Sequence, residues 1–209
     1  MSEPIINRAA LRQGDRICRR RKSRLANMIM RATAGERWDI PPDAWNHTAI
    51  ICDDHGHPAI GDALMGVNCQ LTTPFEWDRD CEVNGTRIIV LRPAEATIAD
   101  GIDAANWWLL NVHGHEYDKI ALRHLLLKRL AGDRFKRLGD PNAFYCSEGV
   151  DAAWAQGPLV PYILPGPDRS SPGKTWRAWK SGALVEVADA LTEYGRKFGG
   201  MRAFLKAAR

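Results

Sequence analysis

The chain has 209 residues, 45% of them hydrophobic and 26% charged, and a formal net charge of +4 at pH 7. Such a chain can bury a full core, and its weak positive charge does not by itself indicate nucleic acid or anionic lipid as a partner. No apolar run approaches the roughly 20 residues that span a bilayer. The first residues lack the basic-then-apolar order of a signal peptide, so we expect a cytoplasmic protein or one packaged in a phage or secreted particle.

The first half of the chain predicts short strands joined by tight turns. Residues 11–17 are predicted to form a turn and a first strand. Residues 19–22, all basic, are predicted to be a solvated loop or helix start, with a phosphate or headgroup contact as the alternative. A helix is predicted from Ser23 to about Ala32. The close spacing of the turns that follow favours antiparallel pairing among four further strands, predicted at residues 48–52, 59–63, 66–71 and 86–91.

The second half is predicted to be mainly helical, which makes the chain α+β: a small antiparallel sheet packed against helices. Apolar residues at helical spacing predict helices at 97–112, 118–130 and 146–156. Five prolines between residues 157 and 173 predict an arm without regular structure. An amphipathic helix is expected at 182–209. We therefore divide the chain into a domain at 1–156 and an arm with a C-terminal helix, 157–209, packed on the same domain.

The five cysteines are odd in number and irregularly spaced, which argues against a disulfide framework. Most are expected to be buried small hydrophobes. Thiolate and imidazole suit zinc, so Cys52, His55, His57 and Cys69 form one candidate metal group. Cys52, however, lies in a predicted strand, and no Cys-x2-Cys pair is present. No metal and no other cofactor is expected.

Cys146 stands out because it comes where a helix is predicted to begin. The free N–H groups of a helix start favour a thiolate, the reactive form of cysteine, and can hold an oxyanion. His47 begins a predicted strand, where a ring is held rigidly at the rim of a sheet. If strands 48–52 and 59–63 pair through the turn at Gly56, Asp62 returns beside His47 and can fix its tautomer. These residues predict a Cys–His–Asp site.

Five short motifs occur in a telling order: Gly14-Asp15, Trp45-Asn46-His47-Thr48-Ala49-Ile50, Ile60-Gly61-Asp62-Ala63, Tyr117-Asp118 and Tyr145-Cys146-Ser147-Glu148. The set resembles the circularly permuted branch of the NlpC/P60 papain-like superfamily, the YiiX-like and lecithin:retinol acyltransferase-like proteins, in which histidine precedes cysteine. The resemblance covers roughly residues 11 to 155 and implies a permuted papain-like fold. This chain departs from the family pattern at Asn46, where serine is usual, and at Asp62, where glutamate is common.

The resemblance implies a cysteine hydrolase that cleaves an amide or ester bond, with Cys146 as nucleophile, His47 as base and Asp62 as the third residue. Tyr117 resembles a family tyrosine near the nucleophile. Tyr145 and Ser147, on either side of the cysteine, are expected in the same oxyanion and substrate-binding region. Asn68 and Asp118 are alternatives to Asp62.

The expected substrate is a peptide, a cell-wall fragment or an acyl lipid. Nucleic acid is not expected as a partner. The alternative hypothesis is a non-catalytic or acyltransferase module of the same fold that binds a lipid, peptide or partner protein, including one that is a component of a phage or secretion system.

Overall fold

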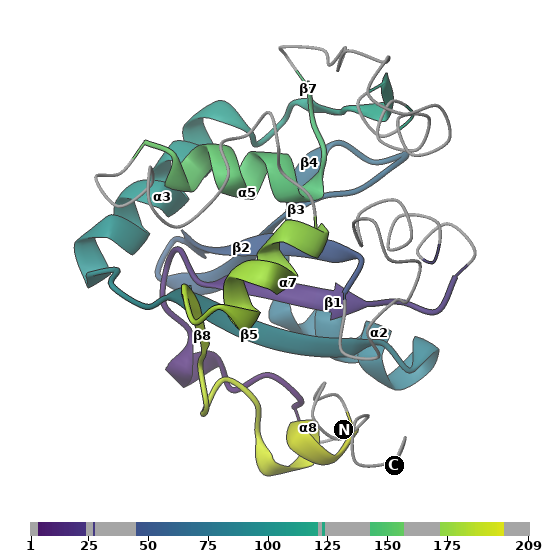
Figure 1. Ribbon diagram of the computed structural model, residues 1–209. Helices are drawn as coiled ribbons and strands as arrows, with labels where there is room; N and C mark the ends of the chain where they lie inside the picture. The colour runs from purple at the N-terminus through teal and green to yellow at the C-terminus, as the bar shows by residue number, and fades with distance from the viewer. Residues whose placement is uncertain are drawn as a thin grey trace.

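A six-stranded antiparallel sheet carries helices on both of its faces (Figure 1), which confirms the predicted α+β class. The computed structural model describes residues 4–23, 27, 45–120, 123, 143–156 and 172–198. The strands lie in the order β4-β3-β2-β1-β5-β8. Their bounds are β1 Arg16–Arg20, β2 His47–Asp54, β3 His57–Ala63, β4 Cys69–Thr72, β5 Arg87–Pro93 and β8 Leu184–Glu186. A separate parallel pair joins β6, Glu116–Tyr117, to β7, Ala143–Phe144.

Two apolar clusters lie on opposite faces of the sheet. In β2, Ile50 and Cys52 belong to the cluster beneath α3 (Ile98–Asn111) and α5 (Cys146–Trp154). Ala49 and Ile51 belong to the cluster that includes residues of α2, Pro74–Asn84. Successive side chains of a strand point to opposite faces, so β2 is buried on both sides, as its apolar sequence predicts.

Capping sequences set where α2 and α3 begin. Thr73 and Glu76 form a capping box at α2, with Pro74 in its first turn, and Gly85 ends the helix with φ of 60°. Thr97 and Asp100 form the equivalent box at α3. Each box satisfies backbone N–H groups that have no partner inside the helix. The helix predicted at 97–112 is confirmed, whereas α2 was not predicted.

The Gly14-Asp15 motif joins the sheet to the helices. Gly14 has φ of +83°, and a Cβ atom there would lie 2.5 Å from Cα of Gly101 in α3. The carbonyl of Gly14 accepts a hydrogen bond from the Trp154 indole of α5 at 3.1 Å. Asp15 accepts two hydrogen bonds from Arg92 of β5, at 2.6 and 2.8 Å. The motif therefore anchors α3, α5 and β5 at one end of β1.

Two sequence-based predictions are wrong. Arg19 is not in a solvated loop: it lies in β1 and is only 3% exposed, because β2 and β5 flank the strand on both sides. The helix predicted from residue 182 is instead strand β8, since Leu184 and Glu186 pair with the free edge of β5. A helix begins only at α8, Glu193–Phe198.

The remaining predicted elements are described in part. A further helix, α7 (Pro172–Lys180), begins where the proline-rich arm was predicted to end, and a short 3-10 helix, η1, spans Arg8–Ala10. The helix expected at 23–32, most of that at 118–130, most of the arm at 157–173 and residues 199–209 lie outside the described residues. Within the described ranges, no helix has the length and apolar character needed to cross a bilayer.

Candidate catalytic site

His47 and Asp62 meet across a β-hairpin. Strands β2 and β3 pair antiparallel, with Ile50 opposite Gly61, through a turn in which Gly56 has φ of +85°. This register, continued by one pair, sets Asp62 opposite Ala49, diagonal to His47 on the same face of the sheet. Nε2 of His47 is hydrogen-bonded to Oδ1 of Asp62. The predicted hairpin pairing is therefore confirmed, while the catalytic roles of the two residues stay predictions.

This hydrogen bond determines which nitrogen of the ring is free to act. A carboxylate only accepts, so Nε2 carries the proton of the neutral imidazole and Nδ1 carries the lone pair. Burial lowers the pKa of His47, but the charge of Asp62 and the hydrogen bond outweigh it, and the pKa is raised. Burial raises the pKa of Asp62, but the charges of His47 and Arg19 outweigh it, and the pKa is lowered.

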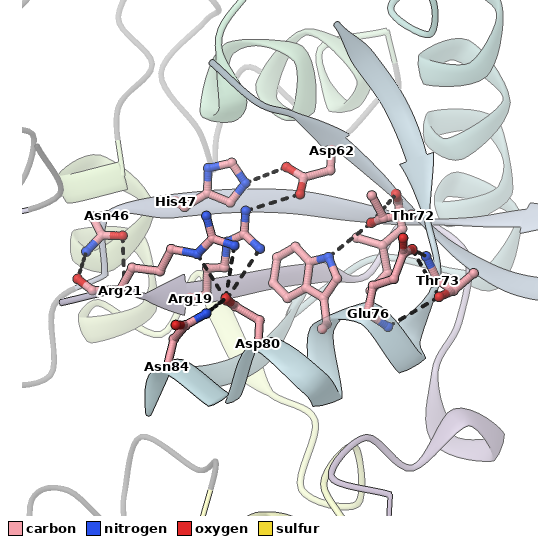
Figure 2. Close-up of polar contacts among 12 residues, drawn as sticks. Arg19, Arg21, Asn46, His47, Asp62, Thr72, Thr73, Glu76, Asp80 and Asn84 are labelled. Carbon is pink, nitrogen blue, oxygen red and sulfur yellow. Dashed lines mark hydrogen bonds and ion pairs between the residues drawn. The ribbon is translucent and has the colours of Figure 1, made fainter. Parts of the chain in front are cut away.

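A second set of polar contacts holds Asp62 from below (Figure 2). Arg19 of β1 lies beside His47 in the strand register and donates through Nη2 to Oδ2 of Asp62 at 3.3 Å. Its guanidinium lies 4.3 Å from the ring centre of Trp77 and 3.8 Å from Oδ2 of Asp80, both in α2. The ring of His47 lies 6.1 Å from that of Trp77. The base is thus supported by three adjacent strands and by α2.

Cys146 is the first residue of α5 and is 5% exposed. The extended backbone of Tyr145 precedes it as the N-cap, and the N–H of Gly149 makes a hydrogen bond to the carbonyl of Tyr145 at 3.2 Å. The backbone N–H groups of Cys146, Ser147 and Glu148 therefore precede the first hydrogen bond along the helix. The helix start expected at Cys146 is confirmed.

A buried ion pair attaches α5 to the sheet. Nη1 of Arg16 in β1 lies 2.5 Å from Oδ1 of Asp151, and their side chains are 0% and 1% exposed. Arg16 points to the α5 face of the sheet, whereas Arg19 points to the α2 face. Two arginines on opposite faces of β1 thus contact the helix that carries the cysteine and the carboxylate that is bonded to the histidine.

The two halves of the site are coupled electrostatically. A thiolate at Cys146 contributes to raising the pKa of His47. The His47 ring, however, lies toward α2, while Cys146 leads a helix on the other face, and no hydrogen bond between these two described residues is present. Hydrogen bonds of a catalytic pair are often long without substrate and tighten when it binds.

The other predicted site residues surround Cys146. Tyr117 is buried and pairs with Phe144 in the β6–β7 ladder, next to the nucleophile motif. Burial, followed by the charge of Cys146, raises the pKa of Tyr117. Tyr145 belongs to the same apolar cluster. The Ser147 hydroxyl is buried with no hydrogen-bond partner among the described residues.

The alternatives to Asp62 differ in their placement. Asn68 lies exposed in the loop between β3 and β4. Asp118 is buried, and its N–H donates to the carbonyl of Phe144 at 3.2 Å. The structure assigns the contact with Nε2 of His47 to Asp62 rather than to either of them.

Cysteines other than Cys146 are suited to packing rather than chemistry. Burial raises the pKa of each of these thiols to about 12; they are Cys18, Cys52, Cys69 and Cys81. The side chain of His55 is 97% exposed, which separates it from the buried Cys52 in the candidate zinc group. Among the residues that the structure describes, no three His, Cys, Asp or Glu side chains are grouped to hold a metal ion.

Three residues that support the site, Arg19, Trp77 and Asp80, were missed in the sequence. Trp77 and Asp80 follow the Thr73-Pro74-Phe75-Glu76 segment, whose capping-box and proline pattern is a signal for a helix start. That signal would have placed both residues on α2. No local pattern pairs either of them with Arg19, because the contacts join residues about sixty positions apart.

Comparison with protein-family models and with curated proteins finds no match to this sequence. Among solved structures, the fold is similar to the crystal structure of the metalloprotein YiiX from Escherichia coli O157:H7. The TM-score is 0.54 and the identity 18%, with 85% of this chain and 96% of that chain covered. At this identity the similarity shows the fold alone, which is a YiiX-like α+β fold.

Proposed function

We propose that this YiiX-like fold carries a thiol hydrolase in which Cys146 is the nucleophile, His47 the base and Asp62 the residue that orients the base. The observation that carries the proposal is the bond from Nε2 of His47 to Asp62. It leaves the lone pair of Nδ1 as the basic site, and Cys146, at the start of α5, acts electrostatically on this ring. A base that is oriented by a third group and that serves a nucleophile is the general pattern of covalent catalysis.

The reaction has two stages. The Cys146 thiol gives its proton to Nδ1 of His47, and the sulfur forms a bond to the substrate carbonyl carbon. The bond from that carbon to the leaving nitrogen or oxygen then breaks, and the leaving group takes the proton from His47. Water adds to the thioester with its proton passing to His47, the C–S bond breaks, and the acid product and the free thiol are restored.

The oxyanion formed in each stage needs hydrogen-bond donors aimed at it. The backbone N–H groups of Cys146 and Ser147 at the start of α5 are the candidates, because the first N–H groups of a helix have no carbonyl partner within it. The raised pKa of Tyr117 keeps its hydroxyl protonated at neutral pH, so that it can donate as well. We assign the oxyanion to these donors, with an amide or ester of a peptide, cell-wall fragment or acyl lipid as substrate.

A metal does not fit this site. The related structure is named a metalloprotein, but in this chain both oxygens of Asp62 are engaged, one by His47 and the other by Arg19. A metal that bound Asp62 would compete with at least one of these contacts, and the described residues supply no group of three ligands. The proposed reaction therefore contains no step through a metal.

The reactivity of Cys146 tests the proposal. We expect iodoacetamide to alkylate it at pH 6–7 at least tenfold faster than a model thiol, and His47→Ala to remove most of this gain, since a positioned base contributes roughly 10²–10⁴-fold. With 4-nitrophenyl acetate we expect a burst of about one equivalent of nitrophenolate per chain, the mark of an acyl-enzyme. Cys146→Ser should abolish the burst.

A matched control is Cys81→Ser, which removes a thiol from the cluster on the α2 side and should leave both readouts unchanged. If Cys146 is alkylated at the rate of a model thiol, and His47→Ala does not slow this alkylation, the proposal is wrong.

One observation favours the non-catalytic alternative: Cys146 is 5% exposed and makes no hydrogen bond to His47. That alternative predicts the slow, His47-independent outcome.

A further inference from the structure

Asp62 is shared between the ring of His47 and the guanidinium of Arg19, one on each oxygen. Oδ1 is bonded to His47 and Oδ2 accepts from Arg19 at 3.3 Å. Asp62 is fully buried, and the side chain of Arg19 is 4% exposed. The carboxylate therefore cannot rotate toward one partner without leaving the other unpaired in a low-dielectric setting.

Arg19 is in turn held in place by α2. Its guanidinium lies over the ring of Trp77 at 4.3 Å, and Asp80 lies 3.8 Å away on the other side. Asp80 also accepts two hydrogen bonds from Arg21, each at 3.0 Å. Trp77 is fastened through its indole N–H, which donates to Thr72 at 3.0 Å. Figure 2 shows this chain of contacts from α2 to the histidine.

The charges of this network balance while His47 is neutral. Arg19 and Arg21 are cations, and Asp62 and Asp80 are anions, so the four cancel. A proton on His47 adds one positive charge to these four groups, of which Arg19, Asp62 and Asp80 are buried and Arg21 is partly exposed. The Cys146 thiolate is the anion that proton transfer within the proposed pair creates, so it serves as the counter-ion of the imidazolium.

We propose that Arg19 is a positioning residue for the base: it clamps Asp62 through Oδ2, and its charge prevents Asp62 from locking His47 in the protonated form. This role rests on the proposed function. If Asp62 alone neutralised the buried imidazolium, His47 would stay protonated. A protonated ring has no lone pair with which to accept the proton of the thiol. With Arg19 opposite, Asp62 orients the ring of His47, while the charge of Arg19 makes the affinity of His47 for a proton lower than Asp62 alone would set it. Burial lowers the pKa of Arg19, so keeping its guanidinium charged in this position has a desolvation cost in free energy.

Several charged or titratable groups face this histidine, and each comes from a different element. Asp62 of β3, Arg19 of β1 and Cys146 of α5 act on it directly. Asp80 of α2 acts through Arg19, and Arg21 acts through Asp80. Tyr117 of β6 senses both Asp62 and Cys146. Of these, Arg19 is the cation that shares a carboxylate with His47.

The pKa of His47 in the folded protein tests this role. It is measured by NMR titration of the ring C–H signals, with His47→Gln to assign them. We expect Arg19→Met to raise the pKa by about one unit, a tenfold gain in proton affinity, because a nearby like charge is removed. Arg19→Lys keeps the charge and should restore the wild-type value to within about 0.3 units. Asp80→Asn removes an anion and should shift the pKa in the opposite direction, downward.

The matched control is Arg92→Met, which breaks another paired arginine–aspartate contact, with Asp15, beyond the opposite end of β1. It should leave the pKa of His47 unchanged. A folded Arg19→Met protein with an unchanged pKa, or an equal shift in Arg92→Met, overturns the inference. If Arg19→Met does not fold, an Asp80→Asn protein whose His47 pKa fails to fall overturns it instead.

This readout needs no turnover, so the two proposals fail separately. An unreactive Cys146 together with a shifted His47 pKa refutes the hydrolase and leaves the electrostatic effect of Arg19 established. A reactive Cys146 and an unshifted His47 pKa refute the role of Arg19 alone.

Discussion

The buried pair of Arg16 and Asp151 offers a quantitative test of how α5 is fixed to the sheet. Both side chains are at most 1% exposed, and Nη1 of Arg16 lies 2.5 Å from Oδ1 of Asp151. Asp151→Asn would leave the Arg16 charge buried without a counter-ion, which costs about 3–5 kcal/mol of the free energy of unfolding. This is a large part of the roughly 5–15 kcal/mol that holds a domain folded. With a urea m-value of about 2–3 kcal/mol/M, the unfolding midpoint should fall by about 1–2 M.

The double variant Arg16→Met/Asp151→Leu separates charge from packing. In the wild type, Nε and Nη2 of Arg16 already lack hydrogen-bond partners in the described structure, so the pair is incompletely satisfied. Replacing both residues with apolar ones of similar volume should recover most of the lost stability, because no charge is then left buried. The reasoning is refuted if Asp151→Asn lowers the free energy of unfolding by less than about 1 kcal/mol. It is also refuted if the double variant is no more stable than Asp151→Asn.

Three further outcomes are expected. At pH 8 the folded protein should take up one equivalent of iodoacetamide, at Cys146, because burial raises the pKa of the other four thiols to about 12. After unfolding in urea it should take up five equivalents. A second adduct on the folded protein, counted by mass spectrometry, contradicts this prediction. The raised pKa of His47 adds stability that is complete below its unfolded value of about 6.5 and is lost as the pH rises through the folded value. Urea midpoints should fall across that range in the wild type and stay flatter in Asp62→Asn, and equal slopes would count against the pairing. Gly101→Ala should cost about 1–3 kcal/mol in thermal melts, because its Cβ would lie 2.3 Å from the carbonyl oxygen of Gln13; an unchanged melting temperature would show that the contact relaxes freely.

Local patterns were sufficient for the hairpin and the helix start. The β-branched and apolar run after His47, the turn at Gly56 and the short strand that follows allow one antiparallel register, which brings Asp62 back toward His47. Cys146 follows a short extended pair and begins a run with helical spacing, so its place at a helix start was also predictable. In both cases neighbours in the sequence supply the interactions that decide the structure.

Local patterns failed where distant residues compete for one segment. Residues after 182 have helical spacing, yet the unpaired edge of β5 recruits Leu184–Glu186 as a strand, since its backbone groups need partners. The basic run that begins at Arg19 resembles a surface cluster, but strands on both sides of β1 bury its first member.

The sequence by itself therefore determined the α+β class, the His47–Asp62 hairpin and the helix that begins at Cys146, because each depends on turn chemistry and on periodicity over a few residues. Only the tertiary structure decided that Arg19 shares Asp62 with His47 and that α2 supports this contact. It also decided that the histidine and the cysteine belong to opposite faces of the sheet. These features join residues far apart in the chain, and a buried charge selects its partner through the packing of the whole fold.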